Sequence, residues 1–124
     1  MDAVSYQNKT FTSTSNTVNG EVNTATVFHY HQSHNDARIV WAEYTGGSIA
    51  KGFLLATIQS DYSLDARYEH INIRGELMTG KCKSTPELLG DGRLRLHEKW
   101  QWTSGDESCG ESVVEEVEVK EEGI

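Results

Sequence analysis

The sequence has few cysteines, no surplus of basic residues and no long apolar segment. Cys82 and Cys109 are the only cysteines, so we expect two reduced thiols rather than a disulfide-stabilised domain. No run of apolar residues approaches the length of a membrane span. Residues 1–13 have neither the basic start nor the apolar centre of a signal peptide. These features together predict a cytoplasmic protein.

The shortage of basic residues limits the partners that the protein can have. Asp and Glu number 19 against 11 Lys and Arg, which gives a formal net charge of -8. Nucleic acids and anionic membrane surfaces both require a basic binding surface, so we expect neither as a partner. Several glutamates gather near the C-terminus, and the pattern predicts a solvated acidic tail over residues 120–124.

One stretch, residues 91–105 (DGRLRLHEKWQWTSG), carries the clearest structural signal. Its side chains alternate between apolar and polar with a period of two, which predicts a strand with one buried face. The apolar face carries Leu94, Leu96, Trp100 and Trp102. Glu98 lies on this same face, where a carboxylate is costly to bury unless a donor pairs with it. We expect that donor to be a hydroxyl of Tyr44 or Tyr68, the ring of His70, or an arginine.

Similar alternation recurs along the chain and predicts about eight strands without a convincing helix. They cover residues 9–14, 24–31, 39–45, 49–59, 64–71, 76–84, 91–105 and 112–119, after a loose leader at residues 1–8. Pro86, the only proline, is expected to begin a loop. Short connections favour sequential antiparallel pairing, and closure removes the two exposed edges. We therefore predict one all-β domain over residues 1–124, a single antiparallel up-and-down β-barrel.

A barrel of this size is wide enough either to be filled by its own side chains or to hold one small ligand. The more aromatic face of each strand supplies a candidate ligand-binding lining. These candidates are Tyr30, Tyr44, Tyr68, His70, Glu98, Trp100 and Trp102. Two alternatives stay open: the polar groups satisfy one another in a closed network, or Glu98 acts in catalysis.

Other chemistry receives less support from the residues. His29, His31 and His34 form an H-x-H-x-x-H pattern, but no third metal ligand follows at a fixed spacing, and surface histidines explain it. No G-x-S-x-G nucleophile motif occurs. We expect no metal and no cofactor.

The end of the stretch with the clearest signal resembles a known barrel family. Residues 95–105, with Trp100 and the closing Thr103-Ser104-Gly105, are similar to a late strand of avidin- and streptavidin-type barrels. This resemblance implies a fold of the general avidin and lipocalin (calycin) type and makes Trp100 a wall of the ligand cavity. The early Asn-Ser-Tyr set of the biotin site in that family has no counterpart here, so the ligand is left unnamed.

A second resemblance covers most of the chain. The segments KTF, YTGG, KG, RYEHIN, GKCKSTPE and DGRLRLHEKWQWTSGD resemble a family of small bacterial cytosolic proteins whose members often carry the name N-acetylglutamate synthase. That name implies acetyl transfer from coenzyme A, for which a Gly-rich phosphate turn leading into a helix is usual. The sequence contains no such turn and favours a binding protein over an enzyme.

Three functional hypotheses follow. The first is a small-molecule-binding barrel with an unknown ligand, and the second is an enzyme of the type that the family's name implies. The third is a structural or oligomerising module with a filled barrel, in which copies of the chain form a homo-oligomer.

Overall fold

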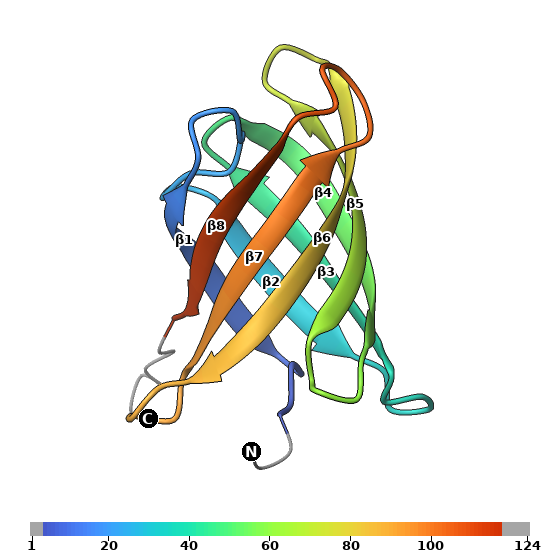
Figure 1. The fold of residues 1–124 in the computed structure, drawn as a ribbon, viewed down its shortest axis with the longest axis vertical. Helices are drawn as coiled ribbons and strands as arrows, with labels where there is room; N and C mark the ends of the chain where they lie inside the picture. The colour runs from blue at the N-terminus through green and yellow to red at the C-terminus, as the bar shows by residue number, and fades with distance from the viewer. Residues whose placement is uncertain (1–3, 118–124) are drawn as a thin grey trace, which may run out of the picture.

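The computed structural model describes residues 4–117, which form a closed barrel of eight antiparallel strands joined in sequence (Figure 1). The strands are β1 (Lys9–Asn16), β2 (Val27–Gln32), β3 (Ile39–Gly46), β4 (Ile49–Ile58), β5 (Leu64–Asn72), β6 (Leu77–Leu88), β7 (Leu94–Trp102) and β8 (Cys109–Glu116). Each strand pairs with the next, and β1 pairs with β8 to close the cylinder. The all-β up-and-down barrel is thus confirmed. The expected acidic tail and the end of the last expected strand, Val119, lie outside the described residues.

The inward and outward faces follow the alternation of the sequence. Along β7, Leu94, Leu96, Glu98, Trp100 and Trp102 are all buried, and the residues between them are more exposed. The glutamate therefore lies inside the barrel, on the face that the sequence predicts. Within residues 4–117, no helix has the length and apolar character needed to cross a membrane.

Several strand boundaries differ from the prediction. Strand β6 continues through Pro86 to Leu88 instead of ending near Ser84. Beyond Ser84, β6 pairs only with β7, because β5 begins at Leu64 opposite Ser84. Proline is tolerated at such an edge, where its missing N–H removes no required ladder bond. Strand β8 begins at Cys109 rather than residue 112, and β2 begins at Val27 rather than residue 24.

The two ends of the barrel are closed differently. The upper end in Figure 1 carries the loops 17–26, 47–48, 73–76 and 103–108, and the lower end carries the loops 33–38, 59–63 and 89–93. Gly46 and Gly47 adopt positive φ angles of 116° and 62° at the β3–β4 turn, a conformation that glycine reaches without steric cost.

The lower end is filled by the N-terminal segment. Tyr6 is fully buried, and its hydroxyl donates to the carbonyl oxygen of Tyr62 at 2.7 Å. Its backbone N–H donates to Gln32 Oε1 at 2.9 Å. Residues 4–8 therefore differ from the loose leader expected from the sequence, because the Tyr6 ring covers the apolar side chains at this end.

Candidate functional site

A cavity of about 50 Å³ opens inside the upper half of the barrel. Its walls come from inward side chains of the strands and from loop 17–26, which lies over its mouth. The lining residues are Asn16, Gly20, Glu21, Val22, Phe28, Tyr44, Leu54, Tyr68, His70, Cys82, Glu98, Trp100, Trp102 and Ser112. We call this space the upper cavity.

Glycines opposite the large rings make room for the aromatic wall. Tyr44 pairs across strands with Gly52, and a Cβ atom at Gly52 would overlap the tyrosine ring. The same relation holds between Tyr68 and Gly80 on β5 and β6. Trp100 and Gly110 repeat it on β7 and β8. An inward glycine beside each ring lets that ring lie flat against the barrel wall and leaves the centre open.

The ring of Trp102 lies at the centre of an aromatic cluster. Its centroid is 5.5 Å from that of Trp100, 5.7 Å from that of His70 and 5.9 Å from that of Tyr68. The interplanar angles of these pairs are 62°, 76° and 66°, which is the edge-to-face arrangement that aromatic quadrupoles favour. The cluster forms one side of the upper cavity.

The two cavity tryptophans donate hydrogen bonds to the end of β1 and to the loop that covers the mouth. Trp100 Nε1 donates to Asn16 Oδ1 at 3.1 Å, and Trp102 Nε1 donates to the carbonyl oxygen of Asn19 at 3.1 Å. Each indole N–H thereby gains the partner that a buried tryptophan requires. The bond from Trp102 connects loop 17–26 to the aromatic wall, and the bond from Trp100 connects the end of β1 to it.

Glu98 lies at the floor of the upper cavity and receives only neutral donors. Ser84 Oγ donates to Glu98 Oε2 at 2.9 Å, and Ser112 Oγ donates to Glu98 Oε1 at 3.0 Å. These serines are the residues directly opposite Glu98 on β6 and β8. The sequence-based expectation of a tyrosine, histidine or arginine donor is therefore wrong, because the register places small hydroxyls next to the carboxylate.

Burial governs the protonation of this region. Desolvation raises the pKa of Glu98, and the hydrogen bonds from the two serines and the Cys82 thiol act in the opposite direction. Burial also raises the pKa of Cys82, with a further contribution from the negative charge of Glu98. The thiol is therefore held in its neutral form.

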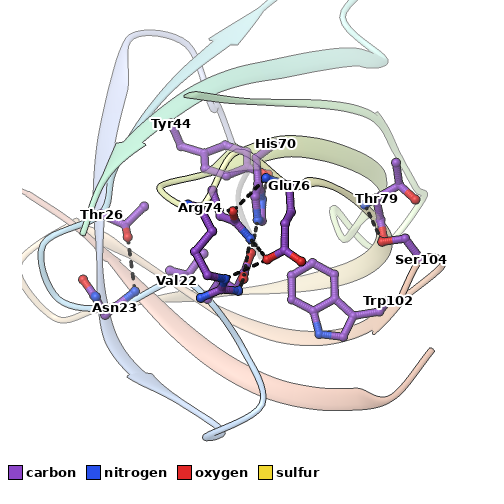
Figure 2. Close-up of polar contacts among 12 residues, drawn as sticks. Val22, Asn23, Thr26, Tyr44, His70, Arg74, Glu76, Thr79, Trp102 and Ser104 are labelled. Atoms are coloured by element: carbon purple, nitrogen blue, oxygen red, sulfur yellow. Dashed lines mark hydrogen bonds and ion pairs between the residues drawn. The ribbon is translucent and has the colours of Figure 1, made fainter. Parts of the chain in front are cut away.

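A chain of three side chains lies at the cavity mouth. The Tyr44 hydroxyl is 2.9 Å from His70 Nδ1, and His70 Nε2 is 2.7 Å from Glu21 Oε1. Figure 2 shows Tyr44 and His70 pointing toward each other, with Arg74 and Glu76 nearby. A neutral ring that carries its proton on Nε2 satisfies both contacts, since Tyr44 then donates to Nδ1 and Nε2–H donates to the carboxylate.

Glu21 is also held by groups from the end of β5 and from the β5–β6 connection. Its Oε2 accepts from Asn72 Nδ2 and from Arg74 at 3.0 Å each. Arg74 Nε also donates to Glu76 at 2.7 Å. Burial lowers the pKa of His70, and the hydrogen bond to Glu21 partly opposes this shift. The loop carboxylate thus connects the mouth of the cavity to the barrel rim.

The structure brings most of the predicted lining together. Tyr44, Tyr68, His70, Glu98, Trp100 and Trp102 all line the upper cavity. Tyr30 is buried but lies toward the lower end, where its ring is 5.0 Å from that of Phe11. Its hydroxyl has no hydrogen-bond partner within residues 4–117. That these seven residues bind a ligand stays a prediction.

Sequence reasoning missed Glu21, Ser84 and Ser112. The two serines alternate inward in their strands, so the period of two contained a signal for them. Glu21 lies in a loop, where no periodicity indicates direction. Among residues 4–117, no group of three or more His, Cys, Asp or Glu side chains is arranged to hold a metal.

The histidines of the H-x-H-x-x-H pattern lie at the barrel surface or near it. His29 Nδ1 is 3.3 Å from the hydroxyl of Thr10. The His31 ring stacks on Trp41 with centroids 5.4 Å apart. Local surface contacts therefore account for both side chains.

A closed eight-stranded meander with a cavity at one end defines the class of small barrels that can enclose one small ligand. A family model described as avidin-like protein matches residues 4–117, and the chain belongs to this avidin-like family. Comparisons with curated proteins and with solved structures returned no match. The avidin-like resemblance of residues 95–105 is confirmed, whereas the name N-acetylglutamate synthase receives no support. Membership of the avidin-like family suggests a barrel that binds a small molecule.

Proposed function

We propose that the protein binds a small molecule in the upper cavity, with Tyr44, Tyr68, His70, Glu98, Trp100 and Trp102 as its contact residues. The observation that carries this proposal is the presence of Glu98 at the cavity floor. A buried carboxylate has a large desolvation cost, and well-packed apolar residues of similar volume in place of it and its serine partners would stabilise the barrel more. Within residues 4–117, the only groups that donate to it are two hydroxyls and a thiol. A ligand group that reaches the cavity floor would give the Glu98 carboxylate a further partner.

The size of the upper cavity makes loop 17–26 part of the mechanism. A volume of about 50 Å³ corresponds to roughly three to five water positions, at about 10–15 Å³ each. Pockets for drug-sized ligands are larger, on the order of 300–1,000 Å³. A ligand of that size therefore enters when loop 17–26 moves, and the loop then covers it.

Two valines of the same loop test this proposal. Val22 lines the cavity and Val18 is fully exposed. A compound library is screened against the wild-type protein by thermal shift, with native mass spectrometry of gently purified protein as a second route to a ligand. Val22→Trp fills the mouth and should abolish the shift, whereas Val18→Trp should retain it. Binding that survives Val22→Trp unchanged, or no bound compound by either method, would contradict the proposal.

We also propose that copies of the chain associate through the outer surface of β3 and β4. Trp41, Phe53 and Leu55 are exposed there, and Trp41 lies directly opposite Leu55. Neighbouring exposed apolar side chains are typical of interfaces, and the avidin-like family often forms oligomers. Sedimentation velocity should give a multiple of the 13.9 kDa chain mass. Leu55→Lys should shift it toward the monomer, while Thr57→Lys, an exposed position on the same strand, should not.

The enzyme hypothesis has its own test. Acetyl-CoA and glutamate are incubated with the purified protein, and free coenzyme A is measured against a boiled control. We expect no protein-dependent release, because residues 4–117 offer strands and turns but no helix N-terminus to hold a pyrophosphate.

A further inference from the structure

The donors in the upper cavity are almost all engaged by the protein itself. The indole N–H of Trp100 donates to Asn16 at the end of β1, and that of Trp102 donates to the carbonyl oxygen of Asn19 in loop 17–26. Asn16 Nδ2 donates to the carbonyl oxygen of Val22 at 3.0 Å. A ligand that presents only acceptors finds few groups here to bind it.

The remaining polar groups follow the same pattern. Tyr44 and His70 are engaged in the chain that ends at Glu21. Ser112 donates to Glu98. Within residues 4–117, the Tyr68 hydroxyl is the one lining hydroxyl without a recorded hydrogen bond, and it can donate or accept. The cavity therefore offers mainly acceptors, of which the carboxylate of Glu98 is the strongest.

The charge of the lining has one sign. Glu98 and Glu21 line the upper cavity, and none of the described lining residues is a lysine or an arginine. Arg74 lies at the rim, where its side chain is 64% exposed and divided between Glu21 and Glu76. Burial favours the neutral form of His70 by lowering its pKa. Among the side chains of residues 4–117, no cation offsets Glu98 inside the cavity.

The aromatic wall adds a second attraction for positive charge. The faces of tryptophan and tyrosine rings carry negative electrostatic potential and attract cations, most strongly where water is excluded. Trp100, Trp102, Tyr44 and Tyr68 surround the same space that Glu98 closes from below. Such a set of rings around a carboxylate is suited to an amine or a quaternary ammonium group.

We propose that the ligand of the upper cavity is a small organic cation of the amine or quaternary-ammonium class. This inference rests on the proposed function and adds the chemical class of the ligand. The ammonium group lies among the rings of Trp100 and Trp102, and Glu98 is its counter-ion.

The proposal requires binding to depend on pH. A cation favours the ionised form of Glu98, so affinity rises as pH rises and the free carboxyl loses its proton. The other titratable groups that face Glu98 are Tyr30, Tyr44, Tyr68 and Cys82, and burial raises the pKa of each. These four groups stay neutral across about pH 5 to 8, and burial favours the neutral form of His70 by lowering its pKa.

The test uses small probes of different charge, of which tetramethylammonium and tert-butyl alcohol have similar shape. Methylammonium and tetramethylammonium are compared with neutral tert-butyl alcohol and anionic pivalate, by titration of tryptophan fluorescence. The protein carries Trp41→Phe, which removes the fluorophore on the outer surface and leaves Trp100 and Trp102 in the cavity. Glu98→Gln removes the counter-ion, and Glu69→Gln, an exposed position on β5, is the matched control.

At pH 7.5 we expect at least one cation to bind tenfold more tightly than tert-butyl alcohol and pivalate not to bind. Glu98→Gln should abolish this preference and Glu69→Gln should keep it. If Glu98→Gln does not fold, the proposal is tested by the pH dependence of cation affinity in the unsubstituted cavity, which should rise with pH. Equal binding of the neutral probe, or a flat pH profile, would overturn the cation proposal. A neutral compound found in the library screen would then still support small-molecule binding, and failure of both experiments would remove both proposals.

Discussion

The two ends of the barrel differ in chemistry although the same strands run through both. Along β7, Leu94 and Leu96 lie toward the lower end, Glu98 lies in the middle, and Trp100 and Trp102 lie toward the upper end. Along β5, aliphatic residues at the lower end likewise give way to Tyr68, His70 and Asn72. The change from aliphatic to polar-aromatic side chains divides the interior into a filled half and a hollow half.

We expect this difference to assign fold stability mainly to the lower half and ligand binding to the upper half. The lower half holds side chains that exclude water entirely, including Phe11, Leu64, Leu96 and Val114. Burial of such groups stabilises the fold. The upper half keeps a carboxylate, a histidine and hydroxyls that stabilise the fold less and form the cavity. We therefore expect substitutions in the lower half to lower stability, and substitutions in the upper half to affect binding more than stability.

The largest effect is expected from two phenylalanines that face each other across β1 and β2. Phe11 is fully buried against Tyr30, whereas Phe28 lines the upper cavity. Phe11→Ala should lower the free energy of unfolding by about 3–5 kcal/mol. Phe28→Ala should cost at least about 1 kcal/mol less, because one side of its ring already faces a cavity that water can fill. Urea denaturation of both variants measures the difference, and equal losses would mean that the upper half is packed like the lower one.

The next effect concerns the glycines that make room for the rings. Gly52→Ala drives a Cβ into the buried Tyr44 ring and should destabilise the barrel by about 1–3 kcal/mol. Gly80→Ala should cost less, since the half-buried Tyr68 can shift outward. In a Tyr44→Leu background, Gly52→Ala should lose most of its cost. An unchanged cost in that background would show that Gly52 is required by the backbone conformation and not by the space that the Tyr44 ring occupies.

The barrel and its inward faces were predictable because the alternation of side chains is a local property of each strand. Closure follows from short connections, and the inward position of Glu98 follows from the spacing of its apolar neighbours. The donors to Glu98 were not predictable. They depend on which residues of β6 and β8 lie opposite it, and a one-residue change of register would replace Ser84 and Ser112.

Positions outside the strands were also hidden from sequence reasoning. Glu21 reaches His70 only because loop 17–26 folds over the barrel end, and loops have no period to indicate direction. Tyr6 lies in a segment without strand character, yet it closes the lower end. Both residues act through contacts that are distant in sequence, which no local pattern reports.

Glu98 should give an intermediate effect whose size depends on pH. Glu98→Ala leaves two serine hydroxyls without their acceptor and should cost about 1–3 kcal/mol, while Lys99→Ala, its outward neighbour, should stay within about 0.5 kcal/mol. The pKa of Glu98 in the folded protein is raised above its ordinary value of 4.5. The folded state therefore holds its proton where the unfolded state has lost it, and stability falls as pH rises above 4.5 through that window.

Glu98→Gln removes the titratable group, so a comparison with wild type measures how much its titration contributes to stability. The difference in unfolding free energy between wild type and Glu98→Gln should shift in favour of the glutamine variant as pH rises from about 4.5 to 7. Urea denaturation at several pH values supplies the comparison. A constant difference across this range would mean that Glu98 titrates normally and is not desolvated.

The smallest effect on stability is expected at the rim, from Arg74. Its ion pair with Glu21 at 3.0 Å connects loop 17–26 to the β5–β6 turn, but its side chain is largely exposed. Exposed ion pairs contribute about 0–1 kcal/mol, so Arg74→Gln should barely change global unfolding. A loss of about 0.5–1 kcal/mol confined to the loop should speed amide hydrogen exchange of residues 17–26 by about two- to fivefold. Arg67→Gln is the control, because Arg67 pairs with Asp65 on the outer surface at 2.7 Å and does not contact the loop. Equal exchange in wild type and Arg74→Gln would show that the remaining bonds to the loop, including those from Trp102, His70 and Asn72, hold it closed without Arg74.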